Sequence, residues 1–211
     1  MSFAGMALRE FLGELGASTP APGGGSASAV AGAMGLALVS MVAGLTPKEA
    51  IQQTEAARLT DVREKACALR ERLLALADED TAAFNCVMRA YRLPKSTDTE
   101  KQARREAIQL ALKGAVRTPL EVLEVAAEGM RLARVVAERG NSNAASDVGV
   151  AALLLDTAMG GAIFNIQINL AAIKDTAFVA DIRAIVEARI EDRDELRETI
   201  IDRVLENIGG E

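Results

Sequence analysis

The segment from Ser26 to Leu45 carries no charged residue, and it constrains the fold more than any other part of the chain. It is rich in Ala, Gly and Ser, so small side chains occupy nearly every helical face and neighbouring backbones can approach closely. Its length is close to that of a membrane span, but it has too little Leu, Ile and Phe to favour a bilayer. We therefore expect a central helix that other parts of the protein bury.

Apolar residues at helical spacing predict helices along most of the remaining chain. Only 3% of the 211 residues are aromatic, and strands favour aromatic and β-branched side chains. The chain has no internal repeat and no linker long enough to divide it. The sequence therefore predicts one all-α domain over residues 1–211, a multi-helical bundle around the small-residue-rich helix. The expected helices carry apolar stripes over residues 3–16, 26–45, 59–91, 97–140, 148–173 and 178–208.

Short polar residues and glycines predict where these helices begin and end. Thr97 and Glu100 form a capping-box pattern, in which each side chain accepts a hydrogen bond from the other residue's backbone N–H. Pro119 should kink or break the helix that follows, because proline lacks this N–H and its ring clashes with the preceding turn. The other expected boundaries are Gly16 and Gly140 as C-terminal ends, Ser146 or Asp147 as one N-cap, and Asp175 or Thr176 as the next.

The chain contains no histidine, and this excludes several kinds of catalysis. Histidine is the usual base near neutral pH and the commonest metal ligand, so Ser-His-Asp, Cys-His and His-zinc mechanisms are ruled out. Proton transfer must use Asp, Glu, Lys, Cys or the single tyrosine, Tyr91, unless water or the substrate's own groups suffice.

Charge and cysteine content indicate the setting in which the chain works. The net charge of −6 argues against general binding to nucleic acid or acidic membranes, since both need a positive field. Cys67 and Cys86 lie on predicted helices and suit reduced cytosolic thiols better than a disulfide. Arg9, Glu10 and Glu14 interrupt the N-terminal segment, which therefore does not resemble a secretory signal. We expect a cytoplasmic location.

A glycine-rich loop precedes the central helix and is the first candidate binding site. It consists of Pro22, Gly23, Gly24, Gly25 and Ser26. Free backbone N–H groups at a helix N-terminus favour an anion or an electron-rich ring edge. The loop lacks the lysine of a P-loop and follows a helix, so nucleotide binding is not supported. From spacing alone, it is either a ligand cradle or a tight turn between packed helices.

Three further groups of polar residues interrupt apolar stretches. Asp80 lies in an apolar stripe, where a carboxylate needs hydrogen-bond partners or a cavity. Asn165 and Asn169 lie one turn apart on an apolar helix, and their amides also need partners. The third group, which precedes that helix, is either a capping segment or part of a binding site, and its members are Asn141, Asn143, Ser146 and Asp147.

The second and third groups cannot share one pocket on a straight helix. Asp147 and Asn165 point the same way, but they lie about 27 Å apart along the axis. Either Gly160 and Gly161 bend the helix, or the two groups meet across a boundary between two copies of the chain. A homodimer with shared sites follows as a hypothesis.

Four motifs stand out when the chain is read as a whole. They are TPAPGGGS from Thr19 to Ser26, LPKST from Leu93 to Thr97, GNSN from Gly140 to Asn143 with Ser146-Asp147, and FNIQINL from Phe164 to Leu170. In their order and spacing they resemble the formiminotransferase-cyclodeaminase C-terminal family, which also includes stand-alone methenyltetrahydrofolate cyclohydrolases. The resemblance covers nearly the whole chain.

This resemblance implies an all-helical subunit, a homodimer or higher assembly, and a tetrahydrofolate derivative bound near the glycine loop, with no metal and no separate cofactor. One branch of the family converts 5-formimidoyl-tetrahydrofolate to 5,10-methenyl-tetrahydrofolate and ammonia. The other branch opens the methenyl compound with water to 10-formyl-tetrahydrofolate. The PAPGGGS and INL segments favour the cyclodeaminase. The cyclohydrolase is the alternative, and a non-catalytic folate-binding or scaffold homologue is a further one.

The resemblance also implies roles for the residues identified above. Ring closure and ring opening both need a proton moved at nitrogen and a tetrahedral carbon stabilised, and a carboxylate can serve both needs. We expect Asp147 to be the acid or base, with Asp80 as second choice. Asn143 and Asn169 would orient the pterin or the one-carbon unit.

The segment from Thr46 to Ile51 departs from the family pattern. Many members carry a basic-aromatic segment here, whereas this chain has one base, Lys48, and no aromatic residue. If that segment grips the substrate elsewhere in the family, three alternatives follow for this chain. It binds folate weakly, it has changed its substrate, or it holds the glutamate tail with Lys95 or Lys101 together with Arg104 and Arg105.

Overall fold

The computed structural model describes residues 2–46 and 52–209. Within these ranges the chain is helical and contains no strand, which confirms the predicted all-α fold. The expected basic-aromatic position lies almost wholly at residues 47–51, outside the described residues. The elements are η1 (Phe3–Gly5), α1 (Leu8–Leu15), α2 (Gly24–Leu45), α3 (Gln53–Tyr91), α4 (Asp98–Arg139), η3 (Ser142–Ala144), α5 (Ala145–Leu170) and α6 (Thr176–Gly209).

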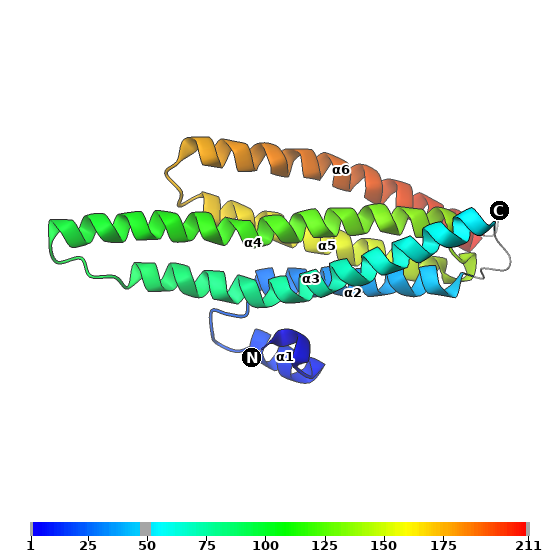
Figure 1. The fold of residues 1–211 in the computed structure, drawn as a ribbon, viewed down its shortest axis with the longest axis horizontal. Coiled ribbons are helices and arrows are strands. Elements are labelled where there is room, and N and C mark those ends of the chain that lie inside the picture. Colours follow the sequence, from blue (N-terminus) through cyan, green and yellow to red (C-terminus); the bar gives the residue numbers. More distant parts are fainter. Residues whose placement is uncertain (1, 47–51, 210–211) are drawn as a thin grey trace.

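Four long helices surround one core, and a fifth covers one side of it. α2 packs against α3 and α5, and α4 packs against the same two helices from the opposite corner. α6 lies over the groove between α4 and α5. In Figure 1 the hairpin of α3 and α4 extends well beyond the start of α2, so one end of the bundle is stepped.

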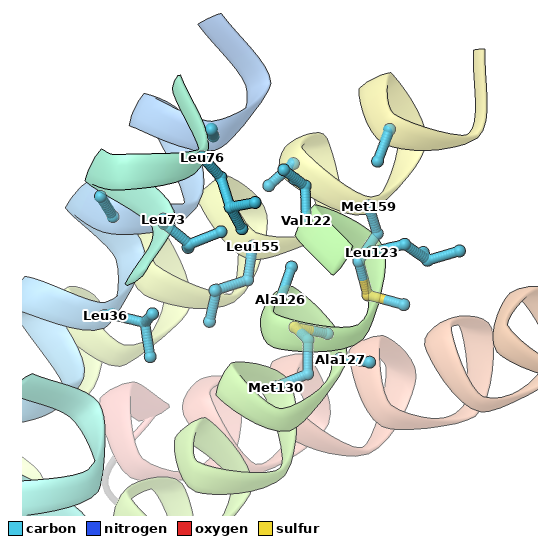
Figure 2. Packing of buried hydrophobic residues seen from close by; sticks show 14 of the residues in the cluster. Leu36, Leu73, Leu76, Val122, Leu123, Ala126, Ala127, Met130, Leu155 and Met159 are labelled. Carbon is cyan, nitrogen blue, oxygen red and sulfur yellow. The ribbon is translucent and has the colours of Figure 1, made fainter. Parts of the chain in front are cut away.

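The uncharged segment is the central helix, as predicted, and it begins at Gly24. Its glycines are needed for close packing. A Cβ on Gly32 would lie 2.8 Å from Leu73 Cδ1, and one on Gly35 would lie 2.8 Å from Leu155 Cγ. Figure 2 shows Leu36, Leu73 and Leu155 meeting from α2, α3 and α5, and all three side chains are fully buried. Small residues on α2 thus let large ones from both neighbours fill the core.

Two helices meet a length and composition criterion for a membrane span, namely Gly24–Leu45 and the segment Ser142–Leu170. In the bundle, 56% of the most apolar window of the first and 50% of that of the second is buried against other helices. Burial in a protein core accounts for the apolar character of their inner faces.

Several predicted helix ends are confirmed. Thr97 Oγ1 accepts from Glu100 N at 3.2 Å, and Glu100 Oε2 accepts from Thr97 N at 2.9 Å, which completes the capping box. Gly140 is the C-cap of α4. Asp175 Oδ1 accepts from Phe178 N at 3.1 Å and caps α6. Cys67 and Cys86 are both free thiols, as expected.

A kink or a break was predicted at Pro119, and the break is wrong, because α4 continues through this residue. Proline cannot donate to the carbonyl four residues earlier, that of Ala115. Asn169 Nδ2 of α5 donates to Ala115 O at 3.4 Å instead. A side chain from a neighbouring helix therefore supplies the donor that the proline lacks.

Two further expectations about helix ends are corrected. Neither Ser146 nor Asp147 caps α5, because a short 3-10 turn precedes it and the helix already begins at Ala145. Asn141 Oδ1 caps this turn by accepting from Asn143 N at 3.0 Å. The N-terminal segment is not one helix over residues 3–16 but η1 followed by α1, with only Phe11 buried in α1.

Candidate active site

A cleft of about 410 Å³ lies at the N-terminus of α2, where α3 and the C-terminal part of α5 converge. Its volume lies within the range of small-molecule binding sites. The residues that line it come from the glycine loop, α3, α4 and α5: Pro20, Ala21, Gly23, Gly24, Gly25, Asp80, Ala83, Phe84, Val87, Met88, Tyr91, Ala115, Asn165, Ile168 and Asn169.

The Asp80 carboxylate of α3 lies directly against the first turn of α2. Its Oδ2 accepts from Ser26 N at 3.1 Å and lies 3.3 Å from Ser26 Oγ. The Ser26 hydroxyl also donates to Ala77 O at 2.8 Å, which holds Ser26 in place. Asp80 thereby satisfies one of the N–H groups that a helix N-terminus leaves free.

This close approach requires glycine at position 25. A Cβ on Gly25 would lie 2.2 Å from Asp80 Oδ1, which is impossible without moving the carboxylate. Among the described residues, no acceptor bonds the N–H groups of Gly24 and Gly25, which lie on the same turn. The loop therefore offers a ligand both backbone donors and a carboxylate.

Burial raises the pKa of Asp80 above its ordinary value, and the hydrogen bonds from Ser26 oppose this shift only in part. Desolvation disfavours the charged form of a carboxylate, whereas bonds from an N–H and a hydroxyl favour it. A carboxylate with a raised pKa can accept and return a proton more readily near neutral pH than an exposed one.

Two asparagines of α5 face the same cleft. Asn165 Nδ2 donates to Gly161 O at 2.8 Å, and Asn169 Nδ2 donates to Asn165 O at 2.9 Å. Asn169 Nδ2 also donates to Ala115 O, so both of its N–H groups are used, whereas Asn165 Nδ2 uses one. Within the described ranges neither Oδ1 receives a donor, so two acceptor atoms remain for a ligand.

The opposite wall of the cleft is apolar. Phe84, Val87, Met88 and Tyr91 follow one another along α3 at helical spacing and line the cleft together. From the sequence, Phe84, Val87 and Tyr91 were predicted to belong to the core stripe, and Tyr91 was also a possible proton-transfer residue. They follow Asp80 at intervals of three and four residues on one face of the helix. This spacing could have predicted that they line the same cleft as Asp80.

The structure therefore unites part of the predicted site. Gly23, Gly24, Gly25, Asp80, Asn165 and Asn169 line one cleft. Pro22 and Ser26 belong to the same loop but are buried and do not line the cleft. Lys95 is exposed in the segment between α3 and α4 and does not line the cleft.

The predicted residues that precede α5 lie elsewhere in the same chain. Asn141 N donates to Thr46 Oγ1 at 3.0 Å, beyond the C-terminal end of α2. α2 has 22 residues, so this end of the bundle is about 33 Å from the glycine loop. Asn141, Asn143, Ser146 and Asp147 are therefore remote from the cleft within one subunit, and α5 runs without interruption through Gly160 and Gly161.

Comparison with known proteins gives a consistent result. The profile of the family described as Formiminotransferase-cyclodeaminase matches residues 7–188. The chain belongs to this family. The glycine loop, Asp80 and the two asparagines that form the cleft all lie inside the matched region.

Individual members of the formiminotransferase-cyclodeaminase family resemble the chain over nearly its full length. Methenyltetrahydrofolate cyclohydrolase of Methylorubrum extorquens is 42% identical over 93% of this chain and 95% of that protein. Formimidoyltransferase-cyclodeaminase of Sus scrofa is 34% identical, and the match covers 93% of this chain but only 36% of that protein. The crystal structure of formiminotetrahydrofolate cyclodeaminase from Thermotoga maritima superposes with a TM-score of 0.86 at 30% identity, covering 95% of this chain and 96% of that one.

Proposed function

We propose that this protein is a 5,10-methenyltetrahydrofolate cyclohydrolase that works in the cytoplasm. The observation that carries the proposal is the Asp80 carboxylate held between the glycine turn and an apolar wall. The sequence motifs alone favoured the cyclodeaminase, but the 42% identity to a cyclohydrolase of nearly equal length supports the alternative better. The cytoplasmic location is supported by the two free thiols.

The cleft suits a tetrahydropterin. The pyrimidine edge of the pterin carries the 2-amino group, N3–H and the 4-carbonyl oxygen side by side, so it presents both donors and an acceptor. Asn165 and Asn169 offer acceptors, and the N–H groups of Gly24 and Gly25 offer donors. Phe84 and Tyr91 can contact the ring and the aminobenzoyl group. Polar groups at fixed points in an otherwise apolar cleft are typical of specific small-molecule sites.

Asp80 supplies the proton chemistry of the reaction. The ionised carboxylate takes a proton from a water molecule as the water oxygen bonds to the carbon between N5 and N10. In the tetrahedral intermediate, the hydroxyl then loses its proton to solvent and forms the formyl C=O, the bond from carbon to N5 breaks, and N5 receives a proton from Asp80. The products are 10-formyl-tetrahydrofolate and one proton released to solvent, so charge and atoms balance. General acid–base assistance of this kind contributes about 10²- to 10⁴-fold to a rate.

The cyclodeaminase reaction remains the second candidate, supported by the similarity to the Thermotoga maritima protein. The same carboxylate would take the proton from N10 as this atom attacks the formimidoyl carbon, and would deliver a proton to the departing ammonia. Both reactions pass through a tetrahedral carbon between N5 and N10, so the cleft geometry serves either.

The methenyl chromophore distinguishes the two reactions. With 5,10-methenyl-tetrahydrofolate as substrate, a cyclohydrolase accelerates the loss of absorbance above the uncatalysed rate. With 5-formimidoyl-tetrahydrofolate, a cyclodeaminase produces this absorbance. We expect the first activity to exceed the second. Faster turnover of the formimidoyl compound would reverse the assignment, and tight binding without either activity would indicate a non-catalytic folate-binding homologue.

Replacement of the proposed base tests the mechanism. Asp80→Asn should lower kcat by about 10²- to 10⁴-fold, because the amide cannot accept the proton from water. Asp61→Asn is a matched control on the same helix, since Asp61 pairs only with Lys65 on the surface. Full activity in Asp80→Asn would remove Asp80 from the catalytic step.

A further inference from the structure

Gly161 lies in the interior of α5, and its contact with α2 explains why this position has no side chain. The glycine does not bend the helix, since α5 runs through it without interruption. A Cβ at this position would lie 2.0 Å from Ser28 Oγ and 3.0 Å from Ser28 Cβ of α2. The first distance is far below van der Waals contact. Gly161 therefore lets the two helices meet at Ser28.

The Ser28 hydroxyl is bonded to the loop that forms the cleft. Ser28 is only 7% exposed, and its Oγ donates to Gly24 O at 2.6 Å. The carbonyl of Gly24 and the N–H of Gly25 belong to one planar peptide group and point in opposite directions. A bond that fixes this carbonyl therefore also fixes the N–H, which is one of the free donors at the cleft. The bond also polarises the peptide group, so the N–H becomes a stronger donor.

Gly161 also directs an acceptor of the cleft. Its carbonyl accepts from Asn165 Nδ2 at 2.8 Å, which leaves Asn165 Oδ1 for a ligand. A Cβ on Gly24 would lie 3.7 Å from the same Nδ2, so the glycine turn and the amide are neighbours. Gly161 thus faces Ser28 with its Cα and holds Asn165 with its carbonyl. The spacing of α2 and α5 at this point sets the distance between the Gly25 donor and the Asn165 acceptor.

We propose that Ser28 and Gly161 are positioning residues, which place the Gly25 N–H and Asn165 Oδ1 for the heterocycle of the substrate. Helix stability does not account for the pair. Glycine is less favourable than alanine inside a helix, and a serine bonded to the carbonyl four residues earlier slightly destabilises one. Neither residue lines the cleft, so each acts through a group that does. The inference rests on the proposed function, because it concerns the binding of that substrate.

The pair should affect binding rather than the chemical step. Asp80 is held by Ser26 N, and the bond from Ser26 Oγ to Ala77 O fixes Ser26 itself. Those bonds use a different peptide group of α2 and a different helix, α3. Loss of the Ser28 hydroxyl should therefore raise KM and leave kcat nearly unchanged. This pattern is expected when an interaction is equally strong in the bound substrate and in the transition state.

The kinetics of Ser28→Ala test this role. With the folate that the wild-type chain turns over, KM should rise about three- to tenfold, while kcat should stay within about twofold of wild type. The dissociation constant of 5-formyl-tetrahydrofolate, a stable analogue, should rise by the same factor in calorimetry. An unchanged KM, or a kcat that falls as much as KM rises, would overturn the proposal.

Gly160→Ala is the matched control on α5. Its Cβ would lie 3.7 Å from Arg193 Nη2, an ordinary contact on the side of α6. We expect the wild-type KM in this variant. A KM raised as much as in Gly161→Ala would show that any methyl group in this turn of α5 disturbs the cleft, and the specific role of Gly161 would be wrong.

A combined substitution separates positioning from packing. In Gly161→Ala, the new methyl group displaces the Ser28 hydroxyl or pushes the helices apart, so both the free energy of unfolding in urea and the affinity should fall. In a Ser28→Gly background the clash is absent, so Gly161→Ala should cost no stability there. KM should nevertheless stay as high as in Ser28→Ala, because the hydroxyl is missing. A wild-type KM in the double variant would show that only packing matters.

The activity of the wild-type chain separates two kinds of failure. If it acts on neither folate, the proposed function fails and the positioning roles fail with it. If it is active and Ser28→Ala keeps the wild-type KM, the proposed function stands and only the roles of Ser28 and Gly161 are wrong.

Discussion

At the scale of single residues, the cleft depends on the contact between Gly25 and Asp80. The glycine lets the carboxylate reach Ser26 N, and this position both buries Asp80 and directs it into the cleft. Sequence analysis ranked Asp147 above Asp80, because Asp147 belongs to a conspicuous polar turn. The packing of α2 against α3 reversed this order within one subunit, and no local pattern could reveal a contact between positions so far apart in the sequence.

Substitution of Gly25 should reduce activity more than stability. In Gly25→Ala, the new methyl group takes the place of Asp80 Oδ1, so the carboxylate must rotate away from Ser26. We expect a fall in kcat of at least tenfold. Gly44→Ala, at the other end of the same helix, is the matched control, because its Cβ would lie 3.5 Å from Arg63 Cζ, an ordinary contact. Equal kcat values for the two variants would contradict the proposed contact.

The raised pKa of Asp80 predicts a pH dependence with opposite signs for activity and stability. The ionised carboxylate is the proposed base, so kcat/KM should rise as pH increases through this pKa, after subtraction of the uncatalysed rate. Folding favours the protonated form, so the contribution of Asp80 to the free energy of unfolding should fall over the same range. Urea titrations of wild type and Asp80→Asn measure the second effect. A wild-type free energy of unfolding that rises with pH relative to that of Asp80→Asn would refute it.

At the scale of helices, the sequence predicted most elements because their signals are local. The Thr97–Glu100 box, the Gly140 end and the Asp175 cap each depend on neighbouring residues, and all three are confirmed. The break predicted at Pro119 did not occur, and the sequence could not show why, because the compensating donor, Asn169, lies on another helix. The same bond fixes Asn169 at the edge of the cleft, so the uninterrupted course of α4 and the position of a site residue have one cause.

A double-mutant cycle tests this link between α4 and α5. Asn169→Ala leaves Ala115 O without a donor and should reduce the free energy of unfolding by about 1–3 kcal/mol. In a Pro119→Ala background, residue 119 can donate to Ala115 O, so the same substitution should cost less. Urea unfolding of the four proteins measures the coupling. An equal cost in both backgrounds would show that Asn169 does not replace the missing donor.

At the scale of the whole molecule, the uncharged α2 belongs to the core, the cleft and an exposed apolar side of the bundle. Its inner side is buried, its first turn receives Asp80, and its outer side carries Met34 and Met41. The sequence predicted a buried helix but not this exposed side, because both sides are apolar and periodicity alone cannot separate core from interface. The predicted site residues are divided between the two ends of the bundle, because sequence spacing does not show which ends of long helices lie together.

A crystal structure with a stable tetrahydrofolate analogue tests the central claim most directly. The pterin ring should lie between the glycine turn and the α3 wall, in contact with Asn165 and Asn169, and its one-carbon position should be within hydrogen-bond reach of Asp80 or one water away. Binding of the analogue at a place that Asp80 cannot reach would contradict the proposed catalytic role and the site built around it.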